Sequence, residues 1–329
     1  MKGAGLLNAA PLQEYLNSQF IAALEKVAGH PLAVGTTGAF AEDFRCAANQ
    51  VNTVMKLNEA EPYIWDANDI PIPPVPFVAI GGDNAVPPNA RMKLAVWGLN
   101  PMFGAGVLEE KTEAVGMNLG NPTHTYAQYA QYHVGITSFP QVLVSAITSN
   151  YYRYLWQVVA YLNPHTQVGL LDFLHGKIPW PFGVKNAANF WMTAQNVGVI
   201  QLEWFPFHSR RSGTIPAAHR PSWLPAYHDI LFSQIVDAVL DPQGVILAVG
   251  KDAAEALQQL LAPQKLKWTS YGWDAAANAY VSSPPARTVR CFSKAVWKDR
   301  RVAVLHEFWH RANGCLNGNR QMAEFLQHL

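Results

Sequence analysis

Four short apolar runs, each leading into a turn or a helical segment, dominate the chain from Met92 onward. The runs read KLAVWG, VGVIQL, GVILAV and RRVAVL, and helical patterns cover residues 222–240, 252–261 and 318–329. Short runs that are rich in Val and Ile and bounded by Gly or Pro are typical of buried strands. Strands that alternate with helices predict a parallel sheet covered on both faces. The sequence therefore predicts an α/β fold of three layers, α/β/α, with a short parallel four-stranded sheet.

The part of the chain before the first run has a different pattern. Apolar residues recur at helical spacing between Leu12 and Val27, and residues 69–88 are rich in Pro and Gly. We expect residues 1–91 to form a helical and Pro-rich extension that packs on the core. Residues 92–329 are expected to form the main domain.

The composition is that of a globular protein with one locally basic segment. Half of the 329 residues are hydrophobic, 14% are charged, and the net charge is +1 at pH 7. These values argue against disorder and against a protein that coats nucleic acid through its net charge alone. Residues 285–329 nevertheless contain eight Lys or Arg and three Asp or Glu. Such a segment fits a DNA-facing surface, and it also fits an ordinary solvated helix face.

The cysteines and the hydropathy pattern bear on the compartment. Cys46, Cys291 and Cys315 are far apart and form no C-x-x-C pair, which argues against a Cys-rich zinc site or an iron–sulfur cluster. A reducing, cytoplasmic compartment is the expectation for such a chain. We find neither a signal-peptide pattern nor an apolar run long enough to span a bilayer, so no membrane partner is expected.

Polar residues follow three of the predicted strands, at the point where each strand ends. GLNPMFG begins at Gly98, Glu203 follows the second run, and His306 follows the last run directly. Each residue alone has an ordinary interpretation, as a turn Asn, a surface Glu or a hydrogen-bonded His. Parallel sheets, however, place their binding sites at the carboxyl ends of strands. Three polar residues at successive strand ends therefore predict a site.

The order of these motifs resembles that of the uracil-DNA glycosylase superfamily, most closely its single-strand-selective monofunctional branch. In that family a G-x-N-P turn follows the first strand, and a His follows the last. The resemblance covers residues from Met92 to the end of the sequence, with GLNPMFG and VLH as the matching motifs. Two positions depart from the family: Glu307-Phe308 replaces the Pro-Ser that follows the His, and Glu203 replaces an Asn that reads the uracil edge.

The resemblance implies a catalytic pair and a mechanism without a cofactor. Asn100, within the turn between Gly98 and Pro101, would hold a water molecule against the deoxyribose. A neutral His306 would donate a hydrogen bond to the pyrimidine O2 atom as negative charge develops there. Water is the nucleophile in this mechanism, so neither a metal ion nor an organic cofactor is required, and no obligate protein partner is inferred.

The resemblance also implies contacts with DNA and with a flipped-out base. Phe103 is the candidate aromatic shelf for the base, with Phe205 and Phe207 as further candidates. Arg311 or Leu316 would fill the gap that the base leaves in the duplex. The residues expected to contact DNA phosphates or polar substrate groups are Ser209, Arg210, Arg211, His310 and Arg311.

Glu203 bears on the identity of the base. Cytosine presents a 4-amino donor, which a carboxylate accepts, whereas a carboxylate would repel the O4 acceptor of uracil. Removal of ordinary cytosine would damage the host genome. We therefore expect a modified cytosine, such as the hydroxymethylated or glucosylated cytosine of phage DNA, and a role in antiviral defence. The alternative is that Glu203 is a surface acid and that the protein is a uracil-DNA glycosylase of base excision repair.

Two other classes of protein fit parts of the sequence. His306, Glu307 and His310 spell H-E-x-x-H, which on a helix binds zinc with the Glu as general base. The preceding VAVL run favours a strand instead, and Glu324 is the only candidate third ligand. A zinc metallohydrolase is the second alternative. A DNA-binding module with the same fold and no activity is the third.

Overall fold

The computed structural model places part of the chain, in two compact units. It describes residues 11–28, 77–81, 91–98, 150–179, 193–194, 196–205, 224–282, 289–306, 315–316 and 318–329. The first unit comprises Met1–Val78, Leu99–Gly135 and Leu202–Ala238, and the second comprises Ala79–Gly98, Ile136–Gln201 and Val239–Leu329. The boundary expected near residue 91 stays a prediction.

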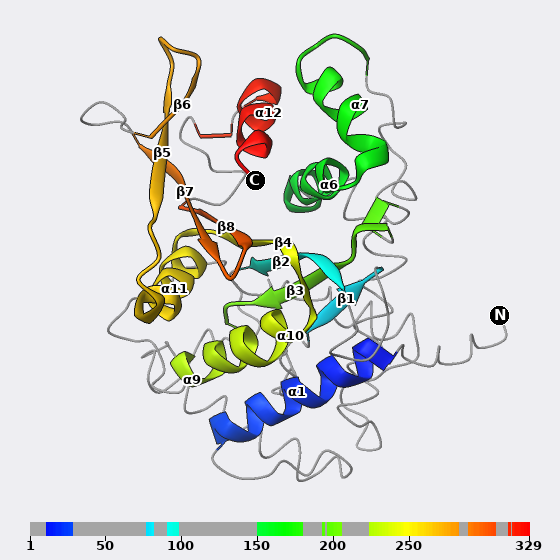
Figure 1. Ribbon diagram of the computed structural model, residues 1–329, viewed down its shortest axis with the longest axis vertical. Helices are drawn as coiled ribbons and strands as arrows, with labels where there is room; N and C mark the ends of the chain where they lie inside the picture. Colours follow the sequence, from blue (N-terminus) through cyan, green and yellow to red (C-terminus); the bar gives the residue numbers. More distant parts are fainter. Residues whose placement is uncertain are drawn as a thin grey trace, which may run out of the picture. The chain divides into compact units, whose positions relative to one another are not determined.

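A mixed sheet of eight strands belongs mainly to the second unit. Its order is β1-β3-β2-β4-β8-β7-β5-β6 (Figure 1). The strands are β1 (Val78–Ile80), β2 (Met92–Gly98), β3 (Val199–Glu203), β4 (Leu240–Val249), β5 (Thr269–Asp274), β6 (Ala279–Val281), β7 (Arg290–Trp297) and β8 (Arg300–Leu305). The ends of β1 and β3 extend into the first unit.

The parallel part of this sheet is its most buried part. β4 pairs in parallel with β2 on one side and with β8 on the other. In this register Ala248 lies opposite both Trp97 and Val304, and the stretch Val245–Val249 is buried throughout. A strand flanked on both sides and covered on both faces has no polar surface, which explains the continuous apolar run in the sequence.

The predicted α/β class is confirmed, but the predicted four-stranded parallel sheet is wrong in size and type. The four expected strands are present as β3, β2, β4 and β8, and they are neighbours in the sheet. β5, β6 and β7 add an antiparallel extension beside β8. These strands were not predicted because their sequences, such as TSYGWD and RCFSKAVW, mix polar and apolar residues and show no continuous apolar run.

Helices accompany the sheet in the part of the second unit that the structure describes. They are α6 (Asn150–Leu162), α7 (Pro164–Leu174), α11 (Lys251–Leu261, extended by the turn η3, Ala262–Gln264) and α12 (Asn319–Gln327). α11 packs on β4 and β8, and α12 packs on α7 and β6. Asn163 caps α7 by accepting a hydrogen bond from the backbone N–H of His165 at 3.0 Å.

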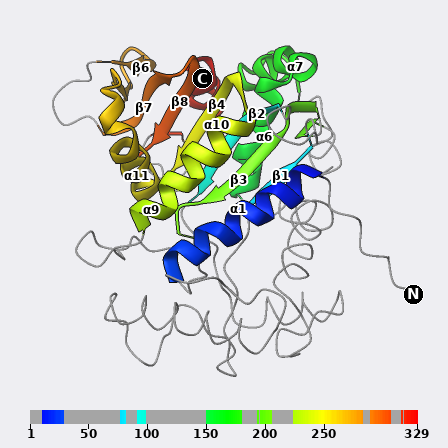
Figure 2. The same ribbon diagram turned by 60° about the horizontal axis from the view of Figure 1, so that its bottom comes forward.

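In the described part of the first unit, two helical segments pack together. α1 (Pro11–Ala28) lies against a segment made of α9 (Leu224–Asp229), η2 (Ile230–Val236) and α10 (Asp237–Val239) (Figure 2). The ring of Phe20 meets the ring of Phe77 edge to face, with centroids 4.6 Å apart. The helix predicted over residues 222–240 is present from Leu224, and its middle widens, because Asp237 donates to the carbonyl of Phe232, five residues back.

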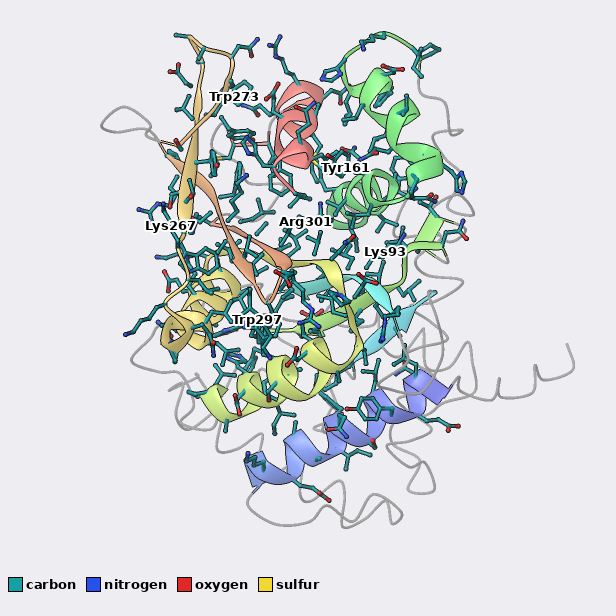
Figure 3. The ribbon with its side chains drawn as sticks, viewed as in Figure 1. Lys93, Tyr161, Lys267, Trp273, Trp297 and Arg301 are labelled. Atoms are coloured by element: carbon teal, nitrogen blue, oxygen red, sulfur yellow. A yellow bond between two sulfur atoms is a disulfide. The ribbon has the colours of Figure 1, made fainter. Side chains whose placement is uncertain are left out.

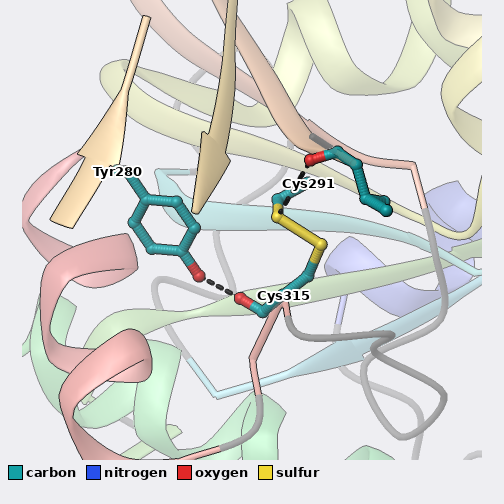
Figure 4. The surroundings of a disulfide bond; sticks show 4 residues. Tyr280, Cys291 and Cys315 are labelled. Carbon is teal, nitrogen blue, oxygen red and sulfur yellow. Dashed lines mark hydrogen bonds between the residues drawn. A yellow bond between two sulfur atoms is a disulfide. The ribbon is translucent and has the colours of Figure 1, made fainter. Parts of the chain in front are cut away.

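A disulfide joins Cys291 on β7 to Cys315, which precedes α12 (Figure 4). Both residues are buried, and their Cα atoms lie 5.2 Å apart. The hydroxyl of Tyr280 on β6 donates to the carbonyl of Cys315. Spacing alone did not predict this bond, because 24 residues separate the two cysteines in sequence. The cytoplasmic location stays a prediction.

Candidate functional site

The carboxyl ends of β2, β4 and β8 lie at one edge of the sheet. The register aligns Trp97 with Ala248 and Val249 with Leu305, so Gly98 and His306 lie at the same edge, with β4 between their strands. The backbone N–H of Gly250 donates to the carbonyl of Leu305 at 3.1 Å, which joins β4 to β8 there. The second unit thus brings the start of the GLNP turn and the last-strand His to one edge.

Gly250 makes the sharp turn from β4 into α11 possible. Its φ is 101°, a conformation that residues with a side chain rarely adopt. The carbonyl of Gly250 accepts a hydrogen bond from the N–H of Ala254, the first bond of the helix. The turn therefore sets the first residues of α11 at the edge that carries His306.

Strand β7 holds both the backbone and the ring of His306 in place. Its backbone N–H donates to the carbonyl of Cys291 at 3.1 Å, which continues the β7–β8 ladder one residue beyond Leu305. Its ring atom Nε2 lies 2.8 Å from the Oγ atom of Ser293 on β7. Backbone and ring are thus both fixed by β7.

His306 is neutral at pH 7. Burial and the nearby guanidinium of Arg290 lower the pKa of His306 to about 4, and the carboxylate of Glu255 opposes them only in part. A neutral imidazole carries one N–H donor and one acceptor nitrogen. His306 can therefore donate a hydrogen bond to a developing anion while its ring is uncharged.

The Ser293–His306 contact has the distance of a nucleophile–base pair, but it does not have the accessibility of one. Ser293 is fully buried, and its Oγ atom also lies 2.8 Å from the Oγ atom of Ser270 on β5. A substrate carbonyl has no path to an atom enclosed in this way. The pair is therefore a means of orienting His306 rather than a covalent catalyst.

In the first unit, α9 anchors the end of β3. The hydroxyl of Tyr227 donates to the backbone carbonyl of Glu203 at 3.3 Å. Nε2 of His228 lies 2.8 Å from the carbonyl oxygen of Trp204, and because that oxygen only accepts, Nε2 carries the proton. Two consecutive carbonyls at the strand end are thus held by consecutive residues of α9.

The environment of Glu203 changes its charge. Burial raises the pKa of Glu203 to about 8, so its carboxyl group is mostly protonated at pH 7. The expected carboxylate is therefore corrected to a neutral carboxyl group, with one O–H donor and one acceptor oxygen. Burial, and after it the charge of Glu203, raises the pKa of Tyr227, which keeps the Tyr227 hydroxyl a donor.

Two of the residues predicted to contact the base or the duplex lie in the core. Phe205 is 1% exposed, with its ring centroid 6.2 Å from that of Trp204. Leu316 is 3% exposed, and its carbonyl accepts from the hydroxyl of Tyr154. Because buried side chains cannot enter a duplex without moving, Arg311 is the better candidate for that role.

Basic residues of the segment 285–329 that the structure describes lie at both ends of β8. Arg290 influences His306, whereas Lys298 and Arg301 lie by the β7–β8 turn at the other end, about 20 Å away for a six-residue strand. Near that turn the buried Arg300 donates to the carbonyl of Leu240, and its guanidinium lies 5.1 Å from the ring centroid of Trp297. Trp297 is labelled in Figure 3. The positive charge of Arg300 therefore serves to hold the strands together.

Other predicted residues lie outside the described part of the chain. They are Asn100, Pro101, Phe103, Phe207, Ser209, Arg210, Arg211, Glu307, His310 and Arg311. Their roles stay predictions.

The zinc metallohydrolase alternative gains no support from the described residues. No group of three His, Cys, Asp or Glu side chains among them could hold a metal ion. His306 comes directly after β8, as the VAVL run predicted, although the rest of the H-E-x-x-H motif is not described. In the same part of the chain, no helix is both long and apolar enough to cross a bilayer.

The sequence analysis missed Ser270 and Ser293. The available signal was weak: Ser293 is one polar residue in CFSKAV, a segment that reads equally well as a half-exposed strand.

Comparisons with protein-family models, with curated proteins and with solved structures found no match to this chain.

Proposed function

We propose that the protein is a monofunctional DNA glycosylase that hydrolyses the N-glycosidic bond of a modified pyrimidine. The observation that carries the proposal is the neutral His306 at the same sheet edge as Gly98, two residues before Asn100. A neutral hydrogen-bond donor fixed at the carboxyl ends of parallel strands suits a reaction in which a base departs with negative charge. β3, β2, β4 and β8 would then form the core of a uracil-DNA glycosylase-like domain.

The chemistry uses the chain's own residues and one water molecule. The target nucleotide is first turned out of the stack. Asn100 holds the water by its amide oxygen as the bond from C1′ to the base breaks, and the base takes the bonding electrons. His306 donates a hydrogen bond to the O2 atom of the base. The water oxygen bonds to C1′ and gives up one proton, and the departing base anion takes up one proton, so that neither product keeps a charge from the broken bond. The products are a free base and an abasic site.

The neutral Glu203 supports a cytosine-type substrate by a route different from that of a carboxylate. The carboxyl oxygen can accept from the 4-amino group while the O–H donates to N3, which satisfies two atoms of the cytosine edge. A modified cytosine, of the kind found in phage DNA, is therefore the preferred substrate.

The same protonation state also favours a second candidate, uracil repair. A neutral carboxyl group can donate to the O4 atom of uracil and accept from its N3–H. The repulsion expected of a carboxylate is absent while Glu203 is protonated, below a pKa of about 8. Uracil is thus the alternative substrate, and pH separates the two.

The deciding experiment is incubation of the full-length protein with DNAs that carry uracil, cytosine, hydroxymethylcytosine or glucosylated hydroxymethylcytosine. Released bases are identified by mass spectrometry, and abasic sites are detected by alkaline strand cleavage. We expect release of a modified cytosine, with no free base from unmodified cytosine. Release of uracil alone would favour repair, and DNA binding without any released base would favour an inactive binding module. The His306→Ala protein is the control for contaminating glycosylases.

A further inference from the structure

Two serine hydroxyls connect strand β5 to the ring of His306. Ser270 on β5 and Ser293 on β7 are cross-strand partners, and their Oγ atoms lie 2.8 Å apart. Ser293 Oγ is in turn 2.8 Å from His306 Nε2. The three groups form one continuous chain across β5, β7 and the end of β8.

The position of Ser293 follows from strand geometry. Its neighbour Phe292 contacts Phe325 of α12, with ring centroids 5.2 Å apart. Because successive side chains of a strand point to opposite faces, Ser293 points to the face away from α12. There it is fully buried, and burial of a hydroxyl costs free energy unless the hydroxyl is hydrogen-bonded.

Each serine hydroxyl has a single proton to donate, so the series of hydrogen bonds from Ser270 to His306 has a direction. If Ser293 donates to Nε2, that nitrogen is the acceptor of the ring and the imidazole proton is on Nδ1. If Nε2 donates to Ser293, the proton is on Nε2 and Nδ1 has a lone pair. In a neutral His, the bond made by one nitrogen thus decides what the other can do.

Resting on the function proposed above, we infer that Ser270 and Ser293 are positioning residues that hold His306 as the tautomer protonated on Nδ1. Ser270 donates to Ser293, Ser293 donates to Nε2, and the Nδ1–H is left to donate to the departing base. In the opposite direction the free nitrogen would present a lone pair, which repels a developing anion. The proposed chemistry needs the first arrangement.

The groups around the ring are consistent with this assignment. Arg290 is a cation that disfavours a second proton on His306, and Glu255 on α11 is the anion that opposes it. Both act on the charge of the whole ring. The choice between the two nitrogens is made by the direct contact with Ser293.

Nitrogen-15 NMR of the histidines in the full-length protein tests the tautomer without a substrate. The chain has 11 His, and the spectrum of His306→Gln identifies the signals of His306 by difference. At pH 7 we expect a protonated Nδ1 and an unprotonated Nε2. In Ser293→Ala we expect a mixture of both tautomers, and in Ser270→Ala a smaller change. Ser18→Ala, which removes an exposed hydroxyl of α1, is the matched control and should change nothing.

Kinetics on the DNA substrate found with the panel provide the second readout. Loss of the orienting hydrogen bond in Ser293→Ala should lower kcat about tenfold and leave KM within about twofold, because the serine does not touch DNA. A wild-type ring protonated on Nε2, or a tautomer that is unchanged in Ser293→Ala, would overturn the inference even if bases are released. Absence of base release with the expected tautomer would overturn the proposed function alone.

Discussion

The side chain of His228 on α9 donates from Nε2 to the backbone carbonyl of Trp204, 2.8 Å away and one residue beyond the end of β3. Tyr227 donates to the carbonyl of Glu203 in the same way. These two bonds satisfy the backbone carbonyls of the last residue of β3 and of the residue that follows it. The result is a fixed backbone under Glu203, the residue to which we assign reading of the base.

Removal of either proposed catalytic side chain should slow base release. We expect Asn100→Ala and His306→Ala each to lower the single-turnover rate at least about tenfold, because a lost transition-state donor typically costs about 2.7–4 kcal/mol. Circular dichroism and thermal unfolding should differ little from those of the wild type. A wild-type rate in either variant would show that the residue has no catalytic role.

His306 should stay neutral well below the usual range for histidine. With its pKa lowered to about 4, His306 should be only about one-tenth protonated at pH 5 and almost fully neutral at pH 7 in an NMR titration. Because the unfolded chain binds this proton at about pH 6.5 and the folded chain does not, the contribution of His306 to stability should rise with pH between about 4 and 6.5. Urea unfolding of wild type and His306→Gln across that range measures it. An NMR titration midpoint of His306 near pH 6.5 would contradict the lowered pKa.

Glu203 should give the two substrates different pH profiles. As pH rises through the Glu203 pKa of about 8, uracil release should fall, since a carboxylate repels O4, and modified-cytosine release should fall less. Glu203→Gln keeps a donor and an acceptor and has no ionisation, so its uracil-to-cytosine ratio should be constant from pH 7 to pH 9. Glu203→Asn should lose cytosine activity because its shorter side chain cannot reach the amino group. A constant ratio in the wild type would mean that Glu203 does not contact the base.

The folded state protonates Glu203 more readily than the unfolded state does. The stability from this group should therefore be fully present below the unfolded pKa of 4.5 and be lost as pH rises from there through the folded pKa of about 8. The pH slope of unfolding in Glu203→Gln, measured beside the kinetics, separates this effect from substrate binding.

The basic residues beyond β3 and β8 should determine the affinity for DNA. A triple variant of Arg210, Arg211 and Arg311 to Ala should bind DNA more weakly. Its affinity should also depend less steeply on salt, because fewer counterions are released from the DNA when fewer phosphate contacts form. The control is Lys298→Ala with Arg301→Ala, at the opposite end of β8. An equal loss in the control would indicate a non-specific charge effect.

The Cys291–Cys315 bond should stabilise the protein. A crosslink over 24 residues typically contributes about 2–4 kcal/mol, so Cys291→Ser and Cys315→Ser should each lower the unfolding free energy by that amount. Reductant should produce the same loss in the wild type, and Cys46→Ser should produce none. Thiol counting on the denatured, unreduced protein should find one free thiol. Three thiols would show that the bond is absent in solution.

Much of the core followed from local pattern. The runs that became β2, β4 and β8 are continuous and apolar because these strands are covered on both faces, so each could be recognised without knowledge of its neighbours. Their parallel alignment then brought Gly98 and His306 to one edge, as strands alternating with helices predict. α1 was equally visible from its helical spacing.

The antiparallel extension and the hydrogen-bonded chain that it carries were not visible in this way. Ser270 and Ser293 meet through pairing between β5 and β7, and Ser293 reaches His306 through pairing between β7 and β8. Sequence spacing does not encode such cross-strand partners, because a slip of one residue would turn each side chain to the other face. The protonation of Glu203 likewise depends on burial, which reflects every segment packed around the carboxyl group. Residue types and the order of the strands along the sequence can be read locally. The tautomer of His306, the charge state of Glu203 and the disulfide partner of Cys291 depend on which distant residues become neighbours.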